Sequence, residues 1–439
     1  MHVVGAGLAG LAAAVALTRA GREVTVYEAG PQAGGRCRSF FDAELGCRID
    51  NGNHLLLAGN QSAMDYLGMI GALATLEGPA EAVLDFVDLA SGERWRLRPG
   101  RGRIPWWVMR PNRRVPGTRA VDYLAGARLR RVGAEATVAE VLEPGSGSRA
   151  WPEAPCAESG KVGAGALDPA SGPGVAGAEA IDPSTVLYRR LWQPFAVAAL
   201  NTAAEDGSAA LFGRVVAETL GRGGAACRPL VPREGLSESL VDPALARLGD
   251  VRFGTRLRGI AFDGPRVTGL DFDGEAVAVE GEVVLAVPAP VAARLVPELV
   301  VPDDYAPIVN AHYRYAVSGD AAPFVGIIGG AAEWVFRKRE VVSVTVSAAD
   351  RLVDLPGEEL AALLWGMWRG STGFRGHPCR RRASSRNGGR RSARRRRNCG
   401  CGRPRARAGS IFSSPATMSI PACRPRSKAL FAPASSRPG

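Results

Sequence analysis

The feature that most constrains the fold is a glycine-rich turn close to the N-terminus. Residues 2–4 form a short apolar strand, Gly5-Ala6-Gly7-Leu8-Ala9-Gly10 follows, and residues 11–20 are helix formers. A second apolar stretch ends on Glu28, 18 residues after Gly10. This order of strand, glycine turn, helix and strand is typical of the βαβ unit that binds dinucleotides, so it predicts an α/β domain with a parallel sheet. Because the first strand begins at residue 1, we expect a few further residues upstream.

Each position of this motif has a physical role. Gly5 allows a tight turn, Gly7 lets the backbone approach a pyrophosphate, and Gly10 lets the helix pack closely on the strand. The N–H groups at the start of the helix can then bind the phosphates. Glu28, which is followed by Ala29, can accept hydrogen bonds from both hydroxyls of an adenosine ribose. A merely structural turn is the alternative, but the flanking strand, helix and acid favour a dinucleotide that contacts residues 5–10, 28 and 29.

Two later segments favour FAD over NAD as the dinucleotide. Gly34-Gly35-Arg36 follows Glu28 closely, and Asp50-Asn51-Gly52-Asn53-His54 comes shortly afterwards. Paired glycines let a loop run flat over a cofactor, and a fixed arginine can neutralise a phosphate or a reduced isoalloxazine. The predicted FAD contacts therefore include Gly34, Gly35, Arg36, Gly52, Asn53 and His54.

With these motifs the chain resembles the superfamily of flavin amine oxidases and phytoene desaturases, and within it the family of hydroxysqualene dehydroxylases. The more discriminating segments are residues 50–57 (DNGNHLLL), 191–202 (LWQPFAVAALNT), 232–240 (PREGLSESL), 307–312 (PIVNAH) and 333–350 (EWVFRKREVVSVTVSAAD). The resemblance covers about residues 1–370. It implies an FAD-dependent oxidoreductase of squalene and hopanoid biosynthesis that reduces hydroxysqualene to squalene by hydride transfer from reduced flavin.

The resemblance also implies a Rossmann-like FAD-binding domain that is discontinuous, with an inserted α+β substrate domain. We place the FAD-binding domain at residues 1–75 and 225–300, and the substrate domain at 76–224 and 301–374. Short apolar runs predict strands near residues 251–253, 267–272, 277–279 and 283–287, the last of them buried. Residues 144–183 are rich in Gly, Ala, Pro and Ser without periodicity, and they predict a flexible surface insertion.

Few residues qualify as the proton donor that removal of a hydroxyl group requires. His54 is the best placed by motif, and a structural histidine near the flavin is the equal alternative. Asp50 and Asn51 are as suited to orienting that loop as to touching substrate. His312 either lines the pocket or packs in the core. The electrons are expected from a reduced nicotinamide or from a reductase.

A hydrophobic isoprenoid substrate implies peripheral contact with a membrane. Residues 103–110 (RIPWWVMR) combine Trp106 and Trp107 with arginines, as a docking loop would. The alternative is two buried tryptophans beside a solvated basic turn. No apolar run reaches the ~18 residues of a membrane span, and no signal peptide is present, so we expect a cytoplasmic chain. The cysteines lack paired C-x-x-C spacing, which argues against a zinc site.

The formal net charge of +12 would ordinarily indicate a nucleic acid or an anionic membrane as partner. However, 18 of the 55 Lys and Arg residues lie after residue 374, where no Asp or Glu occurs. Residues 1–374 hold 37 basic and 43 acidic residues. The basic character therefore belongs to residues 375–439, which we expect to be disordered.

This basic tail has three interpretations: an arginine-rich RNA-binding arm, a solvated disordered tail, or a frameshift near residues 378–379. The frameshift is the hypothesis we prefer. Shifted by one base, residues 413–429 back-translate to Leu-Ala-Gly-Asp-Tyr-Val-Asp-Thr-Gly-Leu-Pro-Ala-Thr-Ile-Glu-Gly-Ala, which resembles the C-terminal flavin-binding motif of the superfamily. We therefore do not expect nucleic acid as a partner, and we expect weak flavin retention by the chain as written.

Two other functions remain open from the sequence. A desaturase or amine oxidase would share the cofactor motifs but move hydride in the opposite direction, from substrate to oxidised FAD. A truncated flavoprotein without activity would follow from the loss of the C-terminal motif.

Overall fold

The computed structural model describes residues 1–144, 182–302, 304–315, 322–338, 340–372, 382–387 and 407–414. The predicted insertion at 144–183 lies almost wholly outside these ranges, as does most of the basic tail. Two strands do fall within the tail, β19 (Arg382–Asn387) and β20 (Arg407–Ser414). The expected disorder of residues 375–439 is therefore wrong for these two strands, because both add to a sheet of the main body.

The predicted dinucleotide-binding unit is present as a four-stranded parallel sheet. The strands are β1 (His2–Val4), β2 (Thr25–Tyr27), β10 (Asp250–Arg252) and β14 (Val283–Leu285), in the order β10-β2-β1-β14. Helix α1 (Leu8–Arg19) follows β1 and packs Leu11 and Val15 against Val3 and Val26, all fully buried. Strands from both ends of the first 300 residues form one sheet, which confirms the discontinuous domain. The strand predicted at 283–287 is present as β14, but the prediction that it is buried is wrong, because β14 is an edge strand and is half-buried.

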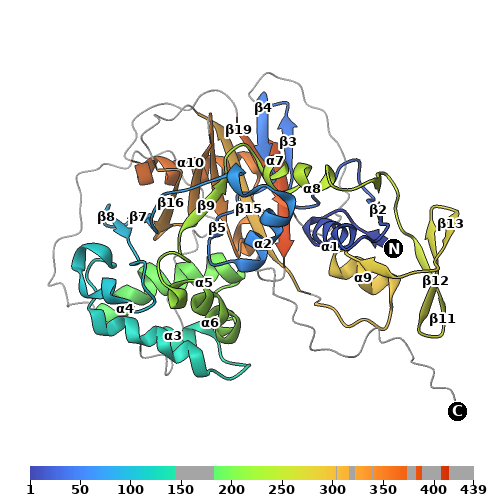
Figure 1. Ribbon diagram of the computed structural model, residues 1–439. Helices are drawn as coiled ribbons and strands as arrows, with labels where there is room; N and C mark the ends of the chain where they lie inside the picture. Colours follow the sequence, from blue (N-terminus) through green and yellow to red (C-terminus); the bar gives the residue numbers. More distant parts are fainter. Residues whose placement is uncertain are drawn as a thin grey trace, which may run out of the picture.

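A three-stranded antiparallel meander packs beside this sheet. It consists of β11 (Gly259–Asp263), β12 (Arg266–Phe272) and β13 (Glu275–Ala278), and α9 (Ala289–Leu295) follows after β14. The rings of Tyr27 and Phe272 stack with centroids 4.4 Å apart, so the meander is anchored on β2. In Figure 1 the meander projects from the nucleotide-binding part at the far right of the molecule.

Short elements lead the chain out of the nucleotide-binding domain and back into it. The outgoing path contains β3 (Ser39–Asp42), β4 (Cys47–Asp50), β5 (Leu56–Leu57), α2 (Gln61–Ile70), η1 (Leu73–Thr75) and β6 (Leu76–Glu77). The returning path contains β9 (Pro229–Pro232), α7 (Leu236–Leu240) and α8 (Asp242–Leu245). Strand β9 pairs with both β5 and β6. The two paths therefore meet where the domains join, and the exact domain boundaries stay predictions.

The second large unit is an eight-stranded mixed sheet with the order β19-β20-β15-β18-β17-β16-β7-β8. Its remaining strands are β7 (Leu84–Asp88), β8 (Arg94–Leu97), β15 (Ala306–Arg314), β16 (Phe324–Ile328), β17 (Trp334–Lys338) and β18 (Val341–Val346). On β18, Val342, Val344 and Val346 pack with helix α10 (Gly357–Thr372), so Ser343 and Thr345 lie on the opposite face. One face of the sheet is therefore apolar and covered, and the other carries polar side chains.

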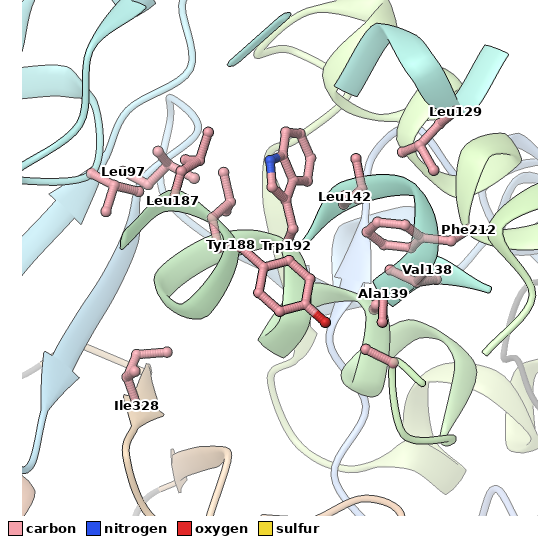
Figure 2. Close-up of a cluster of buried hydrophobic side chains, with 14 of the residues drawn as sticks. Leu97, Leu129, Val138, Ala139, Leu142, Leu187, Tyr188, Trp192, Phe212 and Ile328 are labelled. Atoms are coloured by element: carbon pink, nitrogen blue, oxygen red, sulfur yellow. The ribbon is translucent and has the colours of Figure 1, made fainter. Parts of the chain in front are cut away.

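Helices form the outer part of the substrate domain, below β7 and β8 in Figure 1. They are η2 (Trp106–Met109), η3 (Pro111–Arg113), η4 (Ala120–Arg131), α3 (Val138–Leu142), α4 (Pro183–Leu187), η5 (Tyr188–Trp192), α5 (Gln193–Leu200), α6 (Ala209–Glu218) and η6 (Leu220–Arg222). Figure 2 shows part of their shared core, including Trp192 and Phe212. The predicted helix at 191–200 is confirmed, and Asn201 ends it in the left-handed conformation (φ 53°).

Candidate functional site

The glycine turn after β1 has the shape that a bound pyrophosphate needs. Gly5 has a φ of 101°, and a Cβ atom there would overlap the carbonyl oxygen of Ala286. A Cβ atom on Gly10 would overlap the carbonyl oxygen of Gly5, so α1 can approach the turn only with glycine at this position. Gly7 is the N-cap of α1, and a Cβ atom added to it would have no other atom within 4 Å. Two glycines are thus required by packing, whereas the third faces open space at a helix N-terminus.

Glu28 lies at the end of β2 and is already hydrogen bonded to the glycine turn. Its Oε2 accepts a hydrogen bond from the backbone N–H of Ala6 at 2.8 Å, and its Oε1 accepts one from Gly30 at 2.8 Å. Each carboxylate oxygen retains a further lone pair. The carboxylate is therefore held rigidly beside the turn with acceptor capacity left for ribose hydroxyls.

The second glycine loop packs directly on the first. The backbone N–H of Gly34 donates to the carbonyl of Ala6 at 2.7 Å, and Gly34 forms a β-bridge with Gly7. A Cβ atom on Gly35 (φ 55°) would lie 3.4 Å from the Cα of Gly7. Two loops that the sequence separates by more than twenty residues therefore form one cradle. Because its turns are made of glycines, these positions place no side chain in the way of an FAD pyrophosphate. The residues present fit the cofactor.

A cavity of about 370 Å³ lies where the segment after β4 faces the eight-stranded sheet. Its polar lining includes Ser39, Arg48, Asp50, Asn53, His54, Lys338 and Ser343, and its apolar lining includes Val231, Pro232, Phe336 and Val341. Asp50, Asn53 and His54 of segment 50–54 line the cavity, and Asn51 of the same segment is hydrogen bonded to the carbonyl of Arg36 in the second glycine loop. The cavity therefore lies next to the segment for which contact with FAD is predicted.

Three residues of this segment are held by hydrogen bonds to distant elements. Asp50 accepts from Ser39 Oγ (2.6 Å) with one carboxylate oxygen and from Lys338 Nζ (2.7 Å) with the other. Asn51 Nδ2 donates to the carbonyl of Arg36 at 2.8 Å, and Asn53 Nδ2 donates to Thr345 Oγ1 at 3.0 Å. These hydrogen bonds support the loop-orienting role for Asp50 and Asn51. Asp50 also lines the cavity, and contact with substrate stays a prediction for it.

His54 lines the cavity, and its Nε2 is buried without a hydrogen-bond partner. Burial lowers the pKa of His54 to about 4; Asp50 opposes this shift, and Arg36 and Lys338 add to it. With that pKa, only about one molecule in a thousand carries an imidazolium at pH 7. The unpartnered nitrogen supports contact with a bound group, whereas the low pKa requires that a proton reach His54 before it can act as an acid.

His312 does not line this cavity. It lies on β15, only 1% exposed, with its Nδ1 2.8 Å from Ser343 Oγ. The packing interpretation of His312 fits the structure, and the pocket-lining interpretation does not. Lys338 and Phe336, which do line the cavity, were missed because β17 comes near residue 50 only in the folded chain, although both lie in a segment on which the family resemblance rests.

The two tryptophans of residues 103–110 have opposite environments. Trp107 is buried (6% exposed) and Trp106 is 71% exposed. The docking interpretation therefore suits Trp106 alone, and the interpretation as buried tryptophans suits Trp107 alone. In the part of the chain that the structure describes, no helix is long and apolar enough to cross a membrane. Within the same residues there is no cluster of potential metal ligands, and Cys37, Cys47 and Cys227 are free thiols.

Comparison with known proteins places this arrangement in a family. The model of the flavin containing amine oxidoreductases matches residues 8–373. The hydroxysqualene dehydroxylase of Rhodopseudomonas palustris is 45% identical over 83% of this chain and 80% of its own length, and that of Sinorhizobium fredii is 42% identical with the same coverage. A probable zeta-carotene desaturase of Synechococcus elongatus is 39% identical, but over only 17% of the chain.

Solved structures agree on the fold. A redesigned putrescine oxidase superposes with a TM-score of 0.55 at 18% identity, covering 84% of this chain and 80% of its own. The nucleotide cradle, the mixed sheet beside it and the family match agree, and the cofactor is FAD. The chain belongs to the flavin containing amine oxidoreductases and, within them, to the hydroxysqualene dehydroxylase family.

Proposed function

We propose that this protein reduces hydroxysqualene to squalene, an FAD-dependent step of squalene and hopanoid biosynthesis. The single observation that carries the proposal is the cavity, which is lined by residues of segment 50–54 and combines polar side chains, such as His54 and Lys338, with apolar ones. An isoprenoid alcohol has the matching polarity, with one hydroxyl on a long hydrocarbon. Reduced FAD supplies the hydride when it is bound.

The polar side chains of the cavity would hold the hydroxyl group. Lys338 lines the cavity and is fixed by its ion pair with Asp50, and its ammonium can donate a hydrogen bond to the leaving oxygen. His54 also lines the cavity and is the proposed proton donor. Protonation converts the hydroxyl into water, a far better leaving group.

The apolar side chains have a different task. Val231, Phe336 and Val341 exclude water from the position where a cation develops as the C–O bond breaks. The face of an aromatic ring such as that of Phe336 attracts a cation, which favours the delocalised allylic cation over recapture by water. Phe336 in turn lies against Phe324, with ring centroids 6.3 Å apart.

The direct test is anaerobic turnover of hydroxysqualene by the frame-restored protein, loaded with FAD, with a chemical or nicotinamide reductant. We expect squalene as the product, and we expect no oxidation of phytoene or squalene under aerobic conditions. Desaturation of either hydrocarbon, with hydroxysqualene left unchanged, contradicts the proposal. The identity of the reductant that works in this assay also tests the proposed electron source, a reduced nicotinamide or a reductase.

The role of His54 has its own signature. If the imidazolium is the acid, its population rises about tenfold per pH unit as the pH falls from 7 towards the pKa of about 4, so a chemistry-limited rate rises likewise. His54→Ala should abolish this rise. An unchanged pH profile in the variant leaves His54 with a structural role only.

We further propose that the enzyme works as a peripheral protein at the cytoplasmic face of a membrane, where a hydrocarbon of this kind resides. The support is the exposed Trp106, in a segment that also carries Arg103 and Arg110.

A further inference from the structure

We propose that helices η2 and η4, with the loop before η2, form a docking surface for an anionic lipid bilayer. We call this surface, residues 101–131, the arginine–tryptophan face. The inference names the membrane partner and rests on the proposed function for its purpose, which is access to a hydrocarbon substrate. The binding itself can be measured without substrate.

Large apolar side chains are exposed on this face. Ile104, Trp106 and Met109 are 61%, 71% and 63% exposed, and Val121 and Leu124 are 56% and 67% exposed. Trp106 and Met109 lie three residues apart on η2, and Val121 and Leu124 lie three residues apart on η4, so each 3₁₀ helix presents one apolar edge to solvent. Clustered exposure of this kind marks an interaction site.

The same stretch carries a strong positive charge. Residues 101–131 contain nine arginines and one acid, Asp122, whereas the rest of residues 1–374 contains 28 basic and 42 acidic residues. Asp122 is buried and pairs with Arg119 at 3.0 Å. Arg103, Arg110 and Arg128 are exposed and make no ion pair within the described part of the chain. Local positive charge on an otherwise acidic body is complementary to anionic headgroups.

Contacts of buried and half-buried side chains hold the two helices together. The rings of Trp107 and Tyr123 meet edge to face with centroids 5.4 Å apart, and Tyr123 Oη accepts a hydrogen bond from the backbone N–H of Val115 at 2.9 Å. Arg114 Nη1 donates to the carbonyl of Val108 at 2.8 Å. The exposed side chains therefore project from a rigid base, which lowers the entropic cost of docking.

The base of this face is continuous with the wall of the cavity. Trp107 belongs to the same buried cluster as Trp95 and Phe86, part of which Figure 2 shows. Phe86 contacts Trp334 at 5.8 Å between ring centroids, and Trp334 contacts Phe324 at 6.2 Å. Phe324 contacts Phe336, which lines the cavity. Apolar packing thus extends from the docking surface to the site.

The test uses the full-length protein and vesicles of phosphatidylcholine, with or without phosphatidylglycerol. We expect binding to the anionic vesicles, and quenching of Trp106 fluorescence when the lipid chains are brominated. Trp106→Ser/Met109→Ser should weaken partitioning roughly tenfold. Arg110→Ser/Arg128→Ser/Arg131→Ser should weaken it about 100-fold, at about fivefold for each arginine near the surface.

Matched controls keep the result specific. Val300 is 95% exposed and lies outside this face, so Val300→Ser should bind as the parent protein does. Arg19→Ser/Arg256→Ser/Arg266→Ser removes three exposed arginines from the other domain and should weaken binding far less than the triple substitution within the face. Trp106→Phe should bind normally and lose the bromine quenching.

Two results would overturn the proposal. Equal vesicle binding by parent and face variants, without quenching of Trp106, would assign binding to the basic residues after 374. Binding of an RNA oligonucleotide through Arg110, Arg128 and Arg131, with no partitioning into vesicles, would assign the face to nucleic acid. Neither result depends on turnover, so failure here is distinct from failure of the proposed reaction.

Discussion

His312 should make this protein sensitive to mild acid. The side chain lies on β15, is 1% exposed and shares a hydrogen bond with Ser343, while its Nε2 is buried without a partner. Burial lowers the pKa of His312 from 6.5 to about 4, and the carboxylates of Asp50 and Asp42 oppose the shift only in part. The folded state therefore disfavours the imidazolium, whereas the unfolded chain accepts a proton near pH 6.5.

The sign and size of the effect follow from this difference in pKa. A folded pKa below the unfolded one means that the stability is fully present above about pH 6.5 and is lost as the pH falls towards 4. A difference of roughly 2.5 units corresponds to about 3 kcal/mol below pH 4 and to about 2 kcal/mol at pH 5.

Urea unfolding at about pH 7.5 and about pH 5, on the parent protein and on His312→Gln, measures this contribution. The other titratable groups are the same in both proteins, so their contributions to the free energy of unfolding cancel in the comparison. Glutamine can keep a hydrogen bond to Ser343 but takes up no proton. We expect the free energy of unfolding of the parent to fall by about 2 kcal/mol more than that of the variant. Equal losses in the two proteins would refute the reasoning.

Two further predictions concern the FAD site. Both substitutions are compared with the frame-restored parent. Gly10→Ala should destabilise the fold, because the new Cβ would overlap the carbonyl oxygen of Gly5, whereas Gly7→Ala should keep the thermal transition of the apoprotein and lose flavin absorbance. If neither variant loses flavin, the cradle does not bind it. Restoring the reading frame near residue 378 should yield a protein that retains more flavin on purification than the chain as written, and sequencing that repeatedly confirms the present frame would remove the basis of this prediction.

The parts of the site that were predictable are those encoded within short stretches. The glycine turn, α1 and Glu28 occupy fewer than thirty residues, and their spacing alone implies the geometry. The ion pair of Asp50 with Lys338 joins residues 288 positions apart, and no local pattern specifies it. The family resemblance covered the segment that contains Lys338 but assigned no role to it.

The tryptophan pair shows why sequence spacing alone can mislead. Adjacent residues on a 3₁₀ helix point about 120° apart, so Trp107 enters the core while Trp106 faces solvent. Interpreting the pair as a unit, either buried or membrane-facing, ignored this rotation. A helix predicted over residues 106–109 would have placed the two rings on different sides of the chain.

The parallel sheet also sets the order in which the protein can be made. β1 ends at residue 4, but its partner β14 is complete only at residue 285, and β10 joins β2 from residue 250 onwards. During synthesis, the first βα unit must therefore wait unpaired on one side while about 280 residues, including the whole helical part of the substrate domain, leave the ribosome. Closure of the nucleotide-binding sheet is thus a late event of biogenesis, and FAD can be captured only after most of the cavity that it serves has been synthesised.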